Sequence, residues 1–383
     1  MTIFIDITGF GVIIPLLPFF AASLQAGSTA LGILVASFAI MQFFFSPILG
    51  RISDNVGRRP ILLLSILTSL VSFILFSIAN SFLILLLSRV IAGMATETAV
   101  AQAYIADITS KRERATGLGR IAAAHGAGFI VGPAMGGFLS IYGFWAAGIA
   151  AAVLTLVNLL FVFFFVPESI NRKHLQKPMV PTSEGYYLQR FLKAIAKPII
   201  GAVFAILFVV TFAFSAIPVI APLLGRDFFN IGPVEMSYFF IYIGSVQVLL
   251  QGFVVGKLTK QIGEEKLIAA AALLMAIGMA FTPLIPHILN FLVSLTIAVL
   301  GLGIMNTVIP SFISKNTSAD EQGGMLGTAQ SISSIACVPG PLLGGVIYEF
   351  VGLSAPFFVS AALLIGAFVI GCRVFQMCTR EPT

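Results

Sequence analysis

The chain is dominated by long apolar runs, each of about the length that crosses a bilayer as a helix. Hydrophobic residues make up 58% of the sequence and charged residues 9%, whereas soluble domains carry roughly 25% charged residues. An all-α integral membrane protein is therefore predicted. We count twelve segments, at residues 2–24, 30–49, 60–79, 82–107, 117–140, 143–166, 197–225, 233–256, 266–285, 289–313, 322–348 and 353–376.

Lysine and arginine residues gather on one side of these segments. Of the 21 in the chain, 19 follow the second, fourth, sixth, eighth, tenth or twelfth segment. By the positive-inside rule, both termini and the connection 167–196 are expected in the cytoplasm, with the protein in the plasma (inner) membrane. The net charge of +6 follows from this topology and does not indicate a nucleic-acid partner.

The two halves of the sequence repeat each other. Residues 132–137 read Gly-Pro-Ala-Met-Gly-Gly, and residues 340–345 read Gly-Pro-Leu-Leu-Gly-Gly. A parallel repeat predicts two six-helix bundles with a site between them near the midplane. The expected organisation is an N-terminal bundle at 1–166, a basic cytoplasmic linker at 167–196 and a C-terminal bundle at 197–383. The end of the linker, 186–196, has the pattern of a short amphipathic helix.

One polar stretch stands out between two apolar segments. Residues 50–60 read Gly-Arg-Ile-Ser-Asp-Asn-Val-Gly-Arg-Arg-Pro, and charges of this density cannot stay in hydrocarbon. A short loop at the membrane surface is predicted, with glycine at both ends permitting tight backbone geometry. The corresponding loop of the second half keeps its glycines but has Lys260 where the first has Asp54. It also has Glu264 where the first has Arg58.

These motifs resemble those of the major facilitator superfamily. Residues 50–59 resemble its loop motif, 87–93 its fourth-helix motif and 128–137 its fifth-helix "antiporter" motif. Residues 6–18 are similar to the first helix of the twelve-helix drug–proton antiporters, the tetracycline-efflux-like group. The resemblance implies rocker-switch alternating access, with a proton as coupling ion and no other cofactor.

The resemblance also implies that the charged loop is a latch that holds the two bundles in an outward-open state. The alternative is a loop that only anchors the topology. Because the second loop has lost the aspartate and the two arginines, a one-sided latch centred on Asp54 is predicted. The predicted latch residues are Gly50, Asp54, Gly57, Arg58, Arg59 and Asp107. The glycines of the fifth and eleventh helices are expected to pack helices closely and to seal or rock the bundle interface. This gating motif comprises Gly128, Gly132, Pro133, Gly136, Gly137, Gly340, Pro341, Gly344 and Gly345.

Ionisable residues within the apolar segments are costly and are therefore candidates for function. Glu97, near the middle of the fourth segment, is the first choice for a proton carrier or an anchor for a cationic substrate. Asp6 resembles the first-helix aspartate of the drug antiporters, although a solvated capping role competes. Arg89 and His125 complete the proton-coupling set. For each carboxyl and for the histidine, a structural, hydrogen-bonded role is the alternative.

A substrate cavity is expected to be aromatic and sparsely polar. The predicted function is proton-coupled efflux of small amphipathic or lipophilic compounds by a monomeric antiporter. A symporter or facilitator for a nutrient or lipid is the first alternative, and a non-transporting receptor or scaffold the second. The candidate cavity residues are Gln42, Tyr238, Tyr242, Gln247, Asn306 and Gln330.

The sequence offers no residues for enzymatic catalysis or a metal. It has no P-loop, and its three cysteines show neither a disulfide framework nor metal-ligand spacing. The protein is therefore predicted not to be an enzyme.

Overall fold

The computed structural model describes residues 1–109, 114–169, 198–284, 287–317 and 322–380. This part of the chain is helical and contains no strand. It divides into two compact units: Met1–Pro178 with Asn230–Gly244 form unit 1, and Met179–Phe229 with Ser245–Thr383 form unit 2. The predicted amphipathic helix at 186–196 lies outside the described residues.

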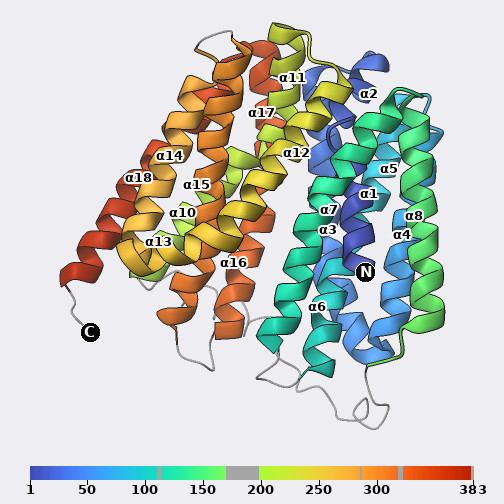
Figure 1. Cartoon of the computed structure of the whole chain (residues 1–383), viewed down its shortest axis with the longest axis horizontal. Coiled ribbons are helices and arrows are strands. Elements are labelled where there is room, and N and C mark those ends of the chain that lie inside the picture. The colour runs from blue at the N-terminus through green and yellow to red at the C-terminus, as the bar shows by residue number, and fades with distance from the viewer. Residues whose placement is uncertain (110–113, 170–197, 285–286, 318–321, 381–383) are drawn as a thin grey trace. The chain divides into compact units, whose positions relative to one another are not determined.

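Each unit consists of long helices, labelled in Figure 1. Those of unit 1 are α1 (Thr2–Ile13), α2 (Leu17–Ser23), α3 (Ser28–Val56), α4 (Arg58–Ser77), α5 (Phe82–Met94), α6 (Glu97–Ile108), α7 (Arg114–Ser140) and α8 (Phe144–Phe165), with most of α12 (Pro233–Leu249). Those of unit 2 are α10 (Pro198–Ser215), α11 (Ile217–Phe229), the π-helix η1 (Leu250–Val254), α13 (Val255–Ile262), α14 (Glu264–Phe281), α15 (Ile288–Lys315), α16 (Gln322–Ala336), α17 (Pro339–Phe350) and α18 (Ala355–Arg380).

The described residues contain nine helices long and apolar enough to cross a membrane, or ten if the bent pair α1 and α2 is one span. The remaining two predicted segments, 117–140 and 266–285, correspond to α7 and α14. The 18 residues of α14 begin with three charged ones, and α7 is rich in glycine and alanine. Both compositions lower the apolar character of the helix without preventing helix formation.

Several predicted spans are broken helices. The first bends by 40° between α1 and α2, where Pro15 and Pro18 remove backbone donors. Pro339 and Pro341 begin α17 in the same way. The fourth span is also interrupted, between Met94 and Glu97, although no proline lies there.

The polar stretch 50–60 is not the loop that the sequence predicted. Helix α3 continues to Val56 and α4 begins at Arg58, so that only Gly57 separates them. Gly57 has φ +116°, a conformation that side chains disfavour. Gly50 lies inside α3, and a side chain there would meet no atom within 4 Å. Helix α3 can continue past the hydrocarbon because the side chains of its charged residues reach water.

The glycine stripe of the fifth span packs unit 1 together. Helix α7 lies against α1, which also contacts α8, and a Cβ at Gly132 or Gly136 would strike the α1 backbone. Pro133 lies inside α7. A Cβ at Gly137 would strike Ser237 of α12, and the first half of α12 accordingly belongs to unit 1 although it follows the predicted boundary at residue 197.

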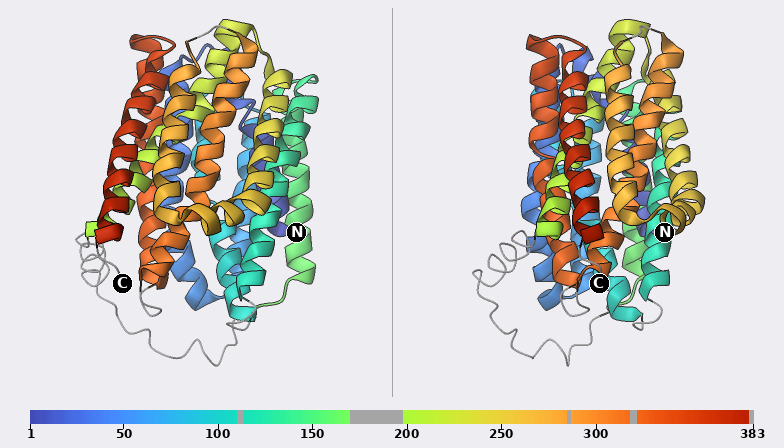
Figure 2. Two further views of the ribbon diagram at one scale, coloured as in Figure 1. Left: turned by 60° about the vertical axis from the view of Figure 1, so that its left-hand side comes forward. Right: turned by 90° about the vertical axis from the view of Figure 1, so that its left-hand side faces the viewer.

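Unit 2 repeats this close packing. Helix α14 packs against both α15 and α18, and the long helices run alongside one another (Figures 1 and 2). In α17, Gly340 approaches the backbone of α10 at Phe212, and Gly344 approaches Ala216. Pro341 and Gly345 are buried beside them. The small residues of both halves therefore allow helices to approach closely. Their role in sealing or rocking the bundle interface stays a prediction.

Candidate functional site

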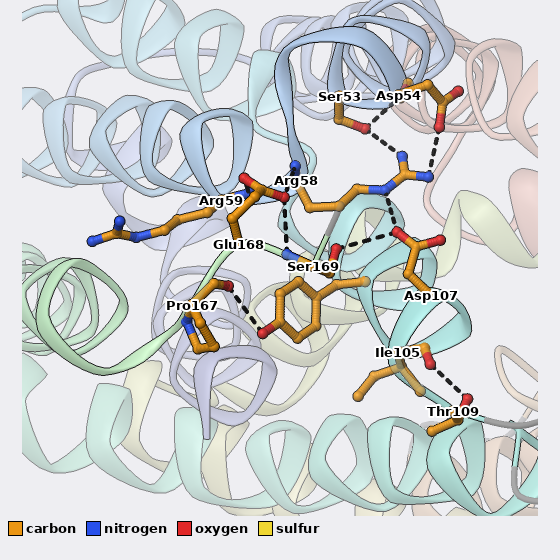
Figure 3. Close-up of polar contacts among 12 residues, drawn as sticks. Ser53, Asp54, Arg58, Arg59, Ile105, Asp107, Thr109, Pro167, Glu168 and Ser169 are labelled. Carbon is orange, nitrogen blue, oxygen red and sulfur yellow. Dashed lines mark hydrogen bonds and ion pairs between the residues drawn. The ribbon is translucent and has the colours of Figure 1, made fainter. Parts of the chain in front are cut away.

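Arg58 is the centre of a network of ion pairs and hydrogen bonds in unit 1 (Figure 3). Its side chain forms ion pairs from Nη2 to Asp54 Oδ1 (2.6 Å) and from Nε to Asp107 Oδ2 (2.9 Å). Its Nη1 donates a hydrogen bond to Ser53 Oγ (2.7 Å). Arg58 is only 8% exposed, so these bonds replace most of the water around the guanidinium. We call Arg58, Asp54, Asp107 and Ser53 the Arg58 cluster.

Glu168 holds the beginning of α4 and was not predicted. Its carboxylate accepts hydrogen bonds from the backbone N–H groups of Arg58 (2.9 Å) and Arg59 (3.1 Å), which otherwise lack helical partners. Ser169 Oγ donates to Asp107 Oδ2 (3.2 Å), so the chain after α8 joins the cluster (Figure 3). A Cβ at Gly57 would collide with the Glu168 carboxylate. The glycine is therefore required by space as well as by its φ angle.

Two predicted latch residues, Arg59 and Gly50, form none of the ion pairs of the cluster in the described structure. The Arg59 guanidinium donates to the Phe163 carbonyl and lies over the Phe163 ring, 5.8 Å from its centroid. Gly50 contributes its backbone carbonyl, which accepts a hydrogen bond from Ser53 Oγ (2.6 Å). The structure thus brings together Asp54, Arg58 and Asp107, with Gly57 as the turn between the helices.

A second cluster in unit 2 has the opposite charges. Gly263, with φ +90°, separates α13 from α14. The next residue, Glu264, is 5% exposed and accepts from Ser311 Oγ (2.5 Å) and pairs with Lys315 Nζ (2.8 Å). We call Glu264, Ser311 and Lys315 the Glu264 cluster. The second turn thus keeps an ion pair with the signs reversed, although it lacks counterparts of Asp54 and of the two arginines of the first turn. The one-sided latch stays a prediction.

The break in the fourth span places Glu97 differently from the sequence prediction. Glu97 is the first residue of α6, not a residue in the middle of a continuous helix. It is 4% exposed and accepts a hydrogen bond from Ser69 Oγ of α4 at 2.6 Å. A carboxylate is favoured at a helix N-terminus, where the backbone N–H groups are unpaired. Beside this hydrogen bond, the hydroxyl oxygens of Thr96, which precedes Glu97, and of Ser65, one turn before Ser69 on α4, lie 3.4 Å apart.

Asp6 lies in α1, which packs against α6, the helix that begins with Glu97. Asp6 is half-buried inside α1 and does not cap that helix. Among the described residues, neither carboxyl has an ion-pair partner. The structure therefore brings two predicted carboxyls, 91 positions apart in the sequence, onto neighbouring helices, with Glu97 buried and Asp6 half-buried.

The other two predicted proton-coupling residues lie in different surroundings. Arg89 is buried in α5, with its guanidinium 5.9 Å from the centroid of the Phe38 ring and no hydrogen-bond partner for Nε in the described structure. His125 is exposed on α7 and stacks on Phe129 at 5.7 Å between ring centroids.

The predicted substrate-cavity residues are divided between the units. Gln247 is half-buried and the other five are exposed within the described structure. Their role as cavity lining stays a prediction. Those of unit 1 are Gln42, Tyr238 and Tyr242, and those of unit 2 are Gln247, Asn306 and Gln330.

Two units of long apolar helices, with ionisable residues buried among them, define a polytopic membrane protein. The family model described as Major Facilitator Superfamily matches residues 1–341 and 247–382, and the chain belongs to this family. It is a transporter and not an enzyme.

Curated relatives and solved structures agree with this assignment. The chain is 30% identical to "Tetracycline resistance protein, class C" of Escherichia coli, covering 98% of this chain and 93% of that one. It is 27% identical to "Multidrug resistance protein 2" of Bacillus subtilis (strain 168), covering 95% and 90%. Among solved structures, a bacterial homologue of the human lysosomal transporter Spinster has TM-score 0.81 at 14% identity, covering 100% and 97%. The human organic anion transporter MFSD10 (TETRAN) has TM-score 0.71 at 22% identity, covering 97% of each chain.

Proposed function

We propose that this transporter exports small amphipathic or lipophilic compounds in exchange for protons, by rocker-switch alternating access. The observation that carries the proposal is that Asp6 and Glu97, on the packed helices α1 and α6, are two carboxyls without an ion-pair partner in the described structure. Two neighbouring carboxylates without a cation are costly inside a membrane protein, so taking up a proton stabilises the site. The tetracycline-resistance and multidrug-resistance relatives support a lipophilic cargo.

The proposed cycle uses this charge as the coupling element. In the outward-open state the pair takes up a proton as the substrate leaves. After the return to the inward-open state, the proton leaves to the cytoplasm and the next substrate binds. A conformational change is driven only by a difference in affinity between its two states, and the charge on the pair supplies that difference. The Arg58 cluster is the proposed latch of the outward-open state.

The proposed setting is the plasma (inner) membrane, with both termini in the cytoplasm and the protein acting as a monomer. The distribution of lysine and arginine supports this orientation. The Arg58 and Glu264 clusters would then face the cytoplasm, and Arg226 would face outward.

A second candidate is transport of an organic anion. Arg89 is buried, and its Nε lacks a hydrogen-bond partner in the described structure. A buried guanidinium without a carboxylate suits an anionic group of a substrate. This candidate predicts transport that depends on Arg89 and proceeds without Asp6 and Glu97.

The deciding experiment is export from proteoliposomes with an imposed pH gradient, with tetracycline and ethidium as probes. Export should stop when the gradient is collapsed. Glu97→Gln should abolish the dependence on the gradient. Glu235→Gln is the matched control, because Glu235 is an exposed carboxyl that accepts from the Gly232 N–H at the start of α12. Export that continues without the gradient, or Glu97→Gln with intact coupling, would overturn proton antiport.

A further inference from the structure

A series of ring contacts crosses unit 1 and ends at a buried guanidinium. The imidazole of His125 stacks on Phe129, one turn further along α7, at 5.7 Å between ring centroids. Phe129 contacts Phe10 of α1 at 6.4 Å, and Phe10 contacts Phe38 of α3 at 5.2 Å. The guanidinium of Arg89 in α5 lies 5.9 Å from the centroid of the Phe38 ring. We call these five side chains the Phe38 cluster.

The Phe38 cluster joins two pairs of packed helices. Helix α1 packs against α7, and α3 packs against α5. Each pair is held backbone to backbone, because a Cβ at Gly128 would strike the Phe4 carbonyl of α1 and a Cβ at Gly93 would strike the Phe38 carbonyl of α3. The contact between Phe10 and Phe38 links the two pairs through side chains, which can change rotamer. A flat ligand can therefore enter at this junction without separating a packed helix pair.

The rings of the Phe38 cluster differ from core rings in their exposure. Its three phenylalanines are half-buried, and its histidine is exposed. By contrast, Phe20 and Phe76, which form another ring contact of unit 1, are both buried. A core contact leaves almost no ring surface uncovered, whereas the Phe38 cluster keeps ring surface that a ligand can cover.

The two polar ends of the cluster indicate that this surface does not face lipid. Ionisable groups at membrane depth face the interior of a bundle or a water-filled cavity. The rings lie between an imidazole at one end and a guanidinium at the other. The open ring surface therefore lies on a path that water or a substrate can reach.

Arg89 determines the charge of the ligand. Its side chain is 3% exposed, its Nε has no hydrogen-bond partner, and it forms no ion pair among the described residues. A buried cation without a counter-ion is costly, and a guanidinium binds an anionic oxygen group through two parallel N–H groups. The adjoining phenylalanine rings favour an aromatic partner, which they contact by stacking or edge to face. Together these groups suit a ligand that is both aromatic and anionic.

We propose that the Phe38 cluster is a binding site for a planar aromatic compound that carries a carboxylate or another anionic oxygen group. The ring system of the compound packs on Phe10 and Phe38, and its anionic group pairs with Arg89. This inference rests on the proposed function, because the ligand is the amphipathic compound that the transporter exports. It names the class of that compound and assigns its recognition to residues other than Asp6 and Glu97.

The test measures binding of tritiated 2-naphthoate to the purified full chain in detergent, by scintillation proximity and without a pH gradient. Binding to the wild-type protein should be saturable. Two analogues each remove one property of this probe: 2-naphthamide lacks the charge, and decahydronaphthalene-2-carboxylate lacks the aromatic rings. Compared with unlabelled 2-naphthoate, the amide should compete about tenfold more weakly and the saturated acid about fivefold more weakly.

Two variants should each remove one of these two preferences. Arg89→Gln should bind 2-naphthoate and 2-naphthamide alike, and it should still prefer the aromatic acid to the saturated one. Phe38→Leu should bind the aromatic and the saturated acid alike, and it should still prefer the acid to the amide. A variant that only perturbed the fold would weaken all three compounds by the same factor, so the pattern of preferences identifies a direct contact.

Phe43→Leu is the matched control. Phe43 is a half-buried phenylalanine of the same helix, and its ring contacts Phe44 at 5.2 Å between centroids. This variant should keep both preferences of the wild-type protein. Phe10→Leu should reproduce the effect of Phe38→Leu, and it replaces that variant if Phe38→Leu fails to fold.

The outcomes separate this inference from the proposed function. If 2-naphthoate does not bind saturably to a protein whose tetracycline export follows the pH gradient, the aromatic site is overturned and the antiporter stands. The site is also overturned if the wild-type protein binds the three compounds equally, or if Arg89→Gln and Phe38→Leu both keep the two preferences. If 2-naphthoate binds with both preferences but export ignores the pH gradient, proton antiport fails and the aromatic site remains.

Discussion

The Arg58 and Glu264 clusters occupy corresponding places in the two repeats but carry opposite charges. In each, a glycine of positive φ ends one helix, and the next residue begins another with a buried charge. That charge pairs with a residue at the end of a later helix, Asp107 for Arg58 and Lys315 for Glu264. The two repeats therefore share the position of an ion pair but not the signs of its two charges.

The helix dipoles make the two arrangements unequal. Glu264 lies in the first turn of α14 and Lys315 in the last turn of α15, the ends that favour their charges. Arg58 begins α4 and Asp107 lies near the end of α6, so both oppose the dipole of their helix. Asp54 and Glu168 supply additional negative groups on the Arg58 side. We infer that the Arg58 cluster is the more easily opened and suits a latch, whereas the Glu264 cluster suits a permanent clasp.

Removing the central charge of unit 1 should have the largest effect. Arg58→Ala leaves Asp54 and Asp107 without their shared cation, and we expect a loss of about 2–3 kcal/mol in the free energy of unfolding. Chemical denaturation in detergent micelles measures this loss. Arg120→Ala, which removes an exposed arginine of α7, is the control and should cost less than about 0.5 kcal/mol. An Arg58→Ala variant as stable as this control would show that the cluster is not held by its ion pairs.

The two glycine turns should differ in their tolerance of a side chain. Gly57→Ala should cost about 2 kcal/mol, because it adds a collision with Glu168 to the strain of a positive φ. At Gly263 the nearest side-chain atom to a Cβ is Glu265 Oε2 at 3.3 Å, so Gly263→Ala should cost about 1 kcal/mol less. Thermal unfolding of both variants measures the difference. Gly50→Ala is the control and should be neutral or slightly stabilising, since Gly50 lies in a helix with open space beside it. Equal losses of stability at both turns would show that the collision with Glu168 does not add to the cost of Gly57→Ala.

Exchanging the charges of the Glu264 cluster tests the role of the helix dipoles. The double variant Glu264→Lys with Lys315→Glu keeps an ion pair. As in unit 1, it places the cation at the start of one helix and the anion at the end of the other. We expect a loss of about 1 kcal/mol, because two favourable dipole interactions become unfavourable. The loss should shrink in high salt. A double variant as stable as wild type would show that the dipoles do not distinguish the clusters.

Much of this architecture could be predicted from sequence because hydrophobic length and charge asymmetry act locally. They predicted the all-α membrane fold and its long apolar helices correctly. The break before Glu97 could not be predicted, since no proline or polar run precedes it and the helix ends where Gly93 packs on the backbone of Phe38. The continuation of α3 through the charged stretch could not be predicted, because a high charge density excludes hydrocarbon but does not exclude a helix.

Two partners of the site residues, Glu168 and Lys315, were beyond sequence reasoning. Glu168 is 110 residues from Arg58, and Lys315 is 51 residues from Glu264. Such pairs depend on how helices pack, and a single sequence carries no signal for that. The internal repeat does contain a clue, since Asp107 and Lys315 lie 208 residues apart, the spacing of the glycine motifs. Reading the two repeats as charge-reversed would have predicted the Glu264 pair.

The mildest change, Asp54→Asn, tests whether the Arg58 cluster acts as a latch. Asp54 is 43% exposed, so its ion pair contributes only about 0.5–1 kcal/mol, which shifts a two-state equilibrium about two- to fivefold. If this pair stabilises the outward-open state, Asp54→Asn should raise labelling of a single cysteine at Gln330 by a maleimide added from the cytoplasmic side, by about that factor. Lys260→Gln, the corresponding change in unit 2, should leave labelling unchanged, because the Glu264 cluster keeps its pair with Lys315. Equal labelling in Asp54→Asn and wild type would reduce the Arg58 cluster to a topological anchor.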